Sequence, residues 1–327
     1  NEYDLSTAWD VSTASFLQVF SVSSEEANPS DLFFKPDGTK MYIVGVSGYE
    51  VNEYDIPLAE FLVLGSGSFA ASDVGKTIEG NGGVAVLSAT DGSYFEVTAF
   101  DDDTTISAGD WAMYGAVFDA TNGLELSSTV LNTWDVSTAS YLQNFSVATQ
   151  DAGPTNVFFK PDGTKMYVLG AIGDTVYEYD LSTAWDVTTA SFLQNFSVSA
   201  QETSPYGFFF KPDGTKMYVI GADGDDVNEY DLSTAWDISA ASFLQSFSIA
   251  SQEVAPRDLF FKPDGTKMYV LGVIGDDVNE YDLSTAWDVS TASFLQLFSV
   301  AAQETAPNGL FFKPDGTKMY VVGESGD

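Results

Sequence analysis

Carboxylates are the main reactive side chains available to this 327-residue sequence, which contains no histidine and no cysteine. Histidine is the commonest general base and metal ligand, and cysteine supplies thiolates, so sites built on either are excluded. Asp and Glu number 48 against 12 Lys and Arg, giving a formal net charge of −36. That charge repels nucleic acid and anionic membranes. No apolar run is long enough for a transmembrane helix, so neither partner is predicted.

The densest acidic loops carry the strongest hint of a metal site. Their carboxylates are Asp223, Asp225, Asp226, Asp276 and Asp277, and oxygen ligands of this kind suit Ca²⁺. The loops lack the twelve-residue spacing and the closing Glu of a dedicated calcium loop. Solvated carboxylates are therefore the favoured interpretation, with Ca²⁺ as the alternative and no other cofactor predicted.

A second set of candidates comes from five near-identical segments, which differ mainly at the two residues after a proline. These pairs are Ser30-Asp31, Thr155-Asn156, Tyr206-Gly207, Arg257-Asp258 and Asn308-Gly309. With a variable loop that contains Tyr49, they are expected on one face of the fold. Variable side chains gathered on one face predict ligand recognition, and neutral drift is the alternative. The predicted contacts are Tyr49, Tyr206, Arg257, Asn308, Asp31, Asn156 and Asp258; no catalytic residue is predicted.

The element that must position these residues is a repeated β-hairpin. Phe-Phe-Lys-Pro-Asp-Gly-Thr-Lys-Met-Tyr begins at Phe33, Phe158, Phe209, Phe260 and Phe311, and the last four starts are 51 residues apart. Proline presets φ for a turn and glycine supplies a positive φ. A fixed period of this size indicates a repeat architecture.

One period predicts four short strands, at residues 206–211, 216–221, 227–232 and 242–249. Four regularly spaced strands separated by turn signals form one antiparallel sheet. Sheets repeated at this period are the blades of a β-propeller. Trp9, Trp134, Trp185, Trp236 and Trp287 recur between the third and fourth strands, where they are expected to be apolar anchors.

The sequence predicts an all-β, five-bladed propeller formed by residues 1–56 and 132–327. Residues 1–22 supply the third and fourth strands of a blade, and residues 308–327 the first and second. The two ends should therefore meet in one shared blade and close the ring, because an open array exposes sheet edges. The sequence begins inside a repeat, so an open array or a fragment of a longer product is the alternative.

Residues 57–131 interrupt the repeat pattern and are predicted to form an inserted small β-domain, either a barrel or a sandwich. Its strands are expected at 60–64, 84–88, 94–100, 111–118 and 124–128, with glycines between them.

The Pro-Asp-Gly hairpin is similar to the turn of YVTN and TolB-type propellers, which implies that the strand before the turn lies at the central channel. In the insertion, Phe69 to Lys76, Gly82-Gly83 and Gly109-Asp110-Trp111 resemble a small β-module of bacteriophage tail and tail-fibre proteins. This second resemblance implies a place on a virion surface or outside the cell.

These resemblances, with no visible catalytic constellation, predict a non-catalytic recognition protein such as a phage tail-fibre or extracellular adhesion component. One propeller face would bind a surface glycan or protein receptor, beside other subunits of a virion. Two alternatives are a subunit of an extracellular filament and a lactonase-type enzyme. The missing histidine and the lack of a convergent acid cluster in the sequence disfavour the enzyme.

Overall fold

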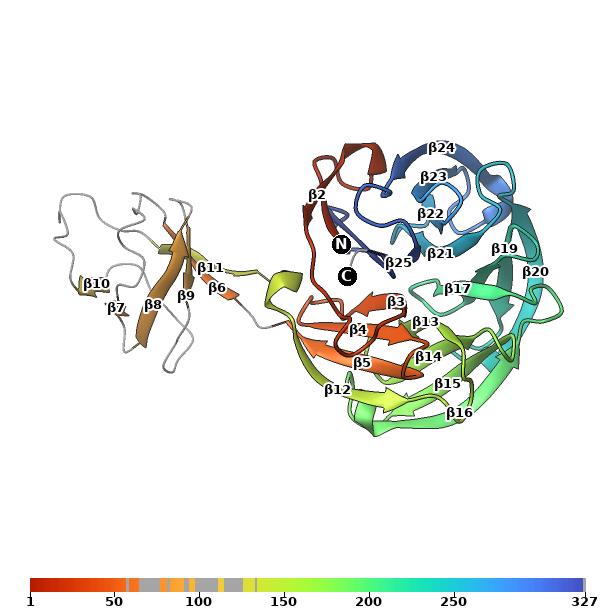
Figure 1. Cartoon of the computed structure of the whole chain (residues 1–327), viewed down its shortest axis with the longest axis horizontal. Helices are drawn as coiled ribbons and strands as arrows, with labels where there is room; N and C mark the ends of the chain where they lie inside the picture. The colour runs from red at the N-terminus through yellow and green to blue at the C-terminus, as the bar shows by residue number, and fades with distance from the viewer. Residues whose placement is uncertain are drawn as a thin grey trace. The chain divides into compact units, whose positions relative to one another are not determined.

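The computed structural model describes residues 1–56 and 134–325 throughout and, between them, the backbone of six strands. Contacts between residues divide the chain into two compact units. Asn1–Ile56 and Val136–Asp327 form the first, and Pro57–Asp135 form the second. The first unit is a closed ring of five four-stranded antiparallel sheets (Figure 1), as predicted.

The blades are numbered here in the order in which their innermost strands occur. Blade 1 contains β3 (Pro29–Phe34), β4 (Lys40–Gly45), β5 (Glu50–Asp55) and β12 (Ser140–Ser146). Blade 2 contains β13 (Pro154–Phe159), β14 (Lys165–Gly170), β15 (Thr175–Leu181) and β16 (Ala190–Ser197). Blade 3 contains β17 (Pro205–Phe210), β18 (Lys216–Gly221), β19 (Asp226–Leu232) and β20 (Ala241–Ser248). The fourth strand of each blade lies on the outside of the ring (Figure 1).

Blade 4 contains β21 (Pro256–Phe261), β22 (Lys267–Gly272), β23 (Asp277–Leu283) and β24 (Ala292–Ser299). Blade 5 joins the two ends of the chain: β25 (Pro307–Phe312), β26 (Lys318–Gly323), β1 (Glu2–Leu5) and β2 (Ala14–Gln18). In the register, Glu2 pairs with Tyr320 and Tyr3 with Met319. The predicted closure by a shared blade is therefore confirmed.

One repeated element was not predicted: a single 3₁₀ turn in each connector between third and fourth strands. These turns are η1 (Val11–Thr13), η3 (Val136–Thr138), η4 (Val187–Thr189), η5 (Ile238–Ala240) and η6 (Val289–Thr291). In η5 the Asp237 carboxylate caps the turn by accepting a hydrogen bond from the Ser239 N–H at 3.0 Å. An aspartate two residues before Ser or Thr was the available signal.

The hairpin turn and the connector tryptophan pack on each other. Gly214 has φ 73°, which favours glycine. A Cβ added to Gly214 would lie 2.4 Å from Trp236, and the Trp236 N–H donates to the Gly214 carbonyl at 3.0 Å. Beside the turn, Lys211 pairs with Asp213 at 2.7 Å. Trp9, Trp185, Trp236 and Trp287 each cover the hairpin of their own blade in this way.

We expect Gly214→Ala to destabilise the ring by about 2–4 kcal/mol, combining a left-handed backbone penalty with overpacking against Trp236. Thermal unfolding would measure the change. Gly224→Ala is the matched control in the same blade, because its added Cβ meets only the Asp226 side chain, which can move. Equal losses in the two variants would contradict the packing role of Gly214.

Neighbouring blades are joined by buried polar contacts as well as by apolar packing. The Tyr42 hydroxyl of blade 1 donates to the Trp185 carbonyl of blade 2 at 2.8 Å. Glu53, which is 1% exposed, pairs with Lys40 at 2.6 Å and accepts the Val187 N–H of blade 2 at 3.1 Å. A buried carboxylate is tolerated because both of its oxygens are satisfied.

The second unit contains β6 (Ala59–Leu64), β7 (Thr77–Gly80), β8 (Gly83–Thr90), β9 (Tyr94–Val97), β10 (Trp111–Tyr114) and β11 (Leu126–Asn132). Their sheet order is β10-β7-β8-β9-β6-β11. The strand at β7 was not predicted. The predicted strand residues 98–100, 115–118 and 124–125 lie outside the described residues.

Candidate functional site

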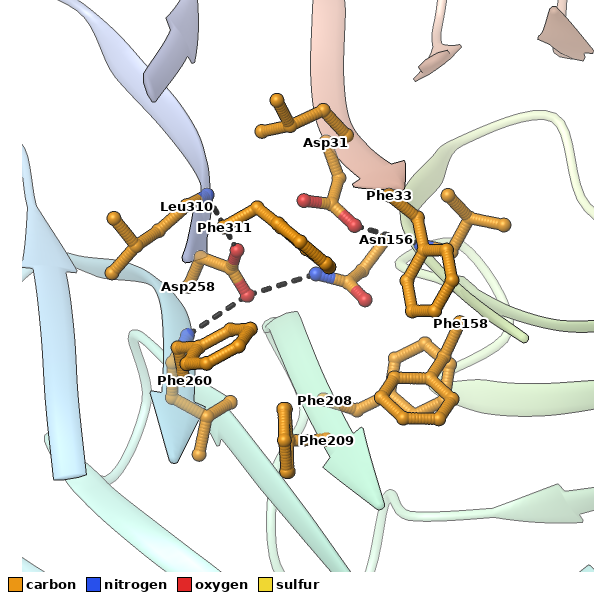
Figure 2. Close-up of a pocket in the computed structure, with 13 residues that line it drawn as sticks. Asp31, Phe33, Asn156, Phe158, Phe208, Phe209, Asp258, Phe260, Leu310 and Phe311 are labelled. Carbon is orange, nitrogen blue, oxygen red and sulfur yellow. Dashed lines mark hydrogen bonds between the residues drawn. The ribbon is translucent and has the colours of Figure 1, made fainter. Parts of the chain in front are cut away.

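The centre of the ring gathers the residues that vary between repeats. The second residue of each variable pair and the phenylalanine two positions later lie on one side of their strand, because side chains alternate. Closure of the ring turns that side toward the channel in every blade. Asp31, Asn156 and Asp258 therefore point into one small cavity (Figure 2), although 227 residues separate Asp31 from Asp258 in the sequence.

Five phenylalanines close the channel on the hairpin side of these polar groups. Each ring meets the next edge-to-face, with ring centroids 5.1 to 5.4 Å apart, in a closed pentagon of Phe33, Phe158, Phe209, Phe260 and Phe311. We call the pentagon and the three polar side chains the cup. It offers about 20 Å³ to the centres of water molecules, and a bound water needs about 10–15 Å³. The cup therefore suits one or two waters.

Glycines occupy the two remaining positions at the level of the carboxylates. A Cβ added to Gly309 would lie 2.6 Å from the Asp31 Cα, and one added to Gly207 would lie 2.7 Å from Asp258 Oδ1. Neither glycine has a positive φ, so the close approach of the neighbouring blade, and not the backbone conformation, explains why these positions are glycine. The small residues make room for the carboxylates of the neighbouring blades.

The two carboxylates are held differently. Asp258 Oδ1 accepts from Asn156 Nδ2 at 2.9 Å and from the Leu259 N–H at 2.8 Å, and its Oδ2 accepts from the Leu310 N–H at 2.7 Å. Asp31 Oδ2 accepts from the Val157 N–H at 3.0 Å. Within the described part of the chain, Asp31 Oδ1 is buried without a hydrogen-bond partner.

Both carboxyls titrate far above their ordinary range. Burial, followed by the charge of Asp258, raises the pKa of Asp31 well above 3.8. Burial also raises the pKa of Asp258, to about 7, and this rise is limited by the N–H groups that stabilise its charge. The donors favour a charged Asp258 and a protonated Asp31. One proton on the pair thus gives an acid and a base facing one cavity.

The other predicted ligand contacts lie outside the cup. Arg257 stacks over the Tyr206 ring, with 4.0 Å between its guanidinium carbon and the ring centroid. Asn308 donates to the Pro29 carbonyl at 3.0 Å, which gives it a role between blades 5 and 1. Tyr49 is exposed in the loop between β4 and β5 and has φ 54°. The predicted set therefore separates into the cup, one stacked pair and two individual residues.

The acidic loops are not drawn together. Asp226 accepts from Asn228 Nδ2 at 2.8 Å, and Asp277 accepts from Asn279 Nδ2 at 2.6 Å. In residues 1–56 and 134–325, no group of three or more acidic side chains is placed to hold a metal ion. Calcium binding by Asp223, Asp225, Asp226, Asp276 and Asp277 stays a prediction. No helix in the described part of the chain is long and apolar enough to cross a membrane.

The chain matches no family model and no curated protein sequence. Among solved structures it resembles a putative 6-phosphogluconolactonase from Bacteroides fragilis, with 16% identity, TM-score 0.45 and coverage of 91% of this chain and 77% of that one. It also resembles the Pseudomonas aeruginosa periplasmic gluconolactonase PpgL, with 16% identity, TM-score 0.41 and 99% coverage of both chains. A third is Chaetomium thermophilum Sqt1, with 15% identity, TM-score 0.38 and coverage of 86% and 64%. Similarity at this level concerns the fold.

The prediction of a non-catalytic phage tail-fibre or adhesion protein is wrong by these comparisons, as is the prediction that the chain is no enzyme. Two of the three solved structures are named as lactonases, and none is a phage or adhesion protein. Sequence reasoning discounted an enzyme because it found no convergent acids. Asp31 and Asp258 do converge, and only closure of the ring brings them together.

Proposed function

We propose that the ring is a hydrolase that opens a small ester or lactone at the mouth of the cup. The observation that carries this proposal is the buried pair Asp31 and Asp258, whose pKa values are both raised in a cavity of water size. Paired carboxyls that share a proton can supply an acid and a base near neutral pH.

In the proposed reaction a water molecule occupies the cup and the substrate carbonyl covers its opening. Ionised Asp258 takes one proton from the water as the water oxygen bonds to the carbonyl carbon. Protonated Asp31 donates a hydrogen bond to the carbonyl oxygen, on which negative charge develops. The ester C–O bond then breaks, and the leaving oxygen takes the proton from Asp258. The products are an alcohol and a carboxylic acid, joined in one molecule when the substrate is a lactone.

The pH dependence of the rate tests this proposal. With γ-butyrolactone or δ-valerolactone in a pH-stat, we expect hydrolysis to rise with pH and reach half of its maximum near pH 7, since the pKa of Asp258 is raised to about 7. At higher pH the rate should fall as Asp31 loses its proton. A half-maximum at an ordinary carboxyl pKa, or no hydrolysis of any lactone, would refute the proposal.

Three further predictions from the sequence stay proposals. The hairpins support membership of the ring among YVTN and TolB-type propellers. The acidic composition supports an extracellular location. The likeness of the insertion to modules of tail proteins concerns the fold of that unit alone.

A further inference from the structure

We infer that Arg257, held against Tyr206, forms a subsite for an anionic group of the ligand, a carboxylate or a phosphate. The inference deepens the proposed function by naming the substrate class, and it rests on that function only for the catalytic comparison below. Its basis is that, within residues 1–56 and 134–325, Arg257 is the one cationic side chain with no carboxylate partner.

In the described part of the chain, every lysine has a carboxylate partner, whereas Arg257 has none. All ten lysines there pair with a carboxylate: Lys35, Lys40, Lys160, Lys165, Lys211, Lys216, Lys262, Lys267, Lys313 and Lys318. Arg257 has no such pair, and its Nε is buried without a hydrogen-bond acceptor. A buried donor left without a partner is costly, and a guanidinium without a carboxylate partner keeps its charge for a ligand that supplies acceptors.

The stacking prepares Arg257 for such a ligand. Contact with the Tyr206 face, at 4.0 Å, holds the planar guanidinium in one orientation. A fixed guanidinium presents parallel N–H groups that match the oxygens of a carboxylate or phosphate. The equivalent residues of the other four blades are Ser30, Thr155, Asn308 and Tyr206 itself, so this arrangement occurs once in an otherwise repetitive ring.

Arg257 lies next to a residue of the cup in the chain. Arg257 immediately precedes Asp258 on β21, so their Cα atoms are about 3.8 Å apart. The phenylalanine pentagon lies farther along the same strands, and Tyr206 and Arg257 are the second residues of β17 and β21, next to the residues that line the cup but not among them. A protein of net charge −36 repels anionic ligands at long range. A local cation is therefore needed to hold one beside the carboxylates.

A direct binding test is possible because Arg257 is the only arginine in the sequence, so its Nε–Hε NMR resonance is unique. We expect this resonance to shift saturably on titration with inorganic phosphate and with acetate, and to stay in place with chloride at equal ionic strength. The Lys262→Gln variant should behave like the wild type, because it removes the same charge from the far end of β21. No shift, or an equal shift with chloride, would overturn the inference.

A catalytic comparison separates this inference from the proposed function. Arg257→Gln should lower kcat/KM, through KM, at least about tenfold more for a γ-butyrolactone that carries a carboxylate than for unsubstituted γ-butyrolactone. An equal loss on both lactones would overturn the subsite and leave the hydrolase standing. Saturable anion binding without hydrolysis of either lactone would keep the subsite and refute the hydrolase.

Discussion

Replacing Asp258 with asparagine should abolish hydrolysis, because an amide cannot take the proton of the attacking water. A positioned general base contributes about 10²–10⁴-fold to a rate, so we expect kcat/KM for γ-butyrolactone to fall by at least about a hundredfold. Asparagine also places an N–H₂ group among the three donors that now face Asp258, from Asn156, Leu259 and Leu310. The variant should therefore gain little stability from losing its charge.

Replacing Asp31 is the matched comparison and should have the opposite effect on stability. A carboxyl whose pKa is raised by folding destabilises the folded state above its ordinary pKa, increasingly so until pH reaches the folded value. Asparagine at position 31 removes one of the two buried carboxyls, which must otherwise stay protonated or carry a buried charge. It also keeps an acceptor for the Val157 N–H and places an N–H group where Asp31 Oδ1 has no partner.

We therefore expect Asp31→Asn to raise the free energy of unfolding above pH 7, because burial raises the pKa of Asp31 well above its ordinary value, and to change it little near pH 4. Urea unfolding at the two pH values measures both effects. Lower stability at both pH values would show that Asp31 is not a strained functional group.

The sequence could predict the features that every repeat carries, but not those that depend on contacts between repeats. The period of 51 residues predicted the strands, the blades and closure, because every repeat carries the same turn chemistry. Asp31, Asn156 and Asp258 were recognised as variable positions on one rim. Their chemistry was missed, since the pKa values depend on burial and on contacts between blades, and neither is visible in one repeat. The stacking of Arg257 on Tyr206 joins blades 4 and 3 and is likewise not visible in one repeat.

The cup forms only when the ring is closed. Opening the ring should therefore lower its stability more than any other change proposed here. Deleting residues 1–22 removes β1 and β2 and exposes the edge of β26, which pairs with Glu2, Tyr3 and Asp4. It also removes the Trp9 carbonyl, which accepts from the Tyr269 hydroxyl at 2.7 Å, and the Val11 N–H, which donates to Glu280 at 3.1 Å. Blade 4 loses these partners as well, so the damage reaches beyond blade 5.

We expect this deletion to abolish cooperative thermal unfolding of the whole ring and, with it, the NMR and kinetic signatures of the cup. The control deletion is larger but leaves the ring closed: it joins Ile56 to Trp134 through Ser-Thr-Ala, the connector of blade 3. If closure determines stability, the smaller deletion should unfold the ring and the larger one should leave its unfolding transition in place. If each blade were stable with only one neighbour, as in an open array, removal of residues 1–22 would instead leave most of the transition intact.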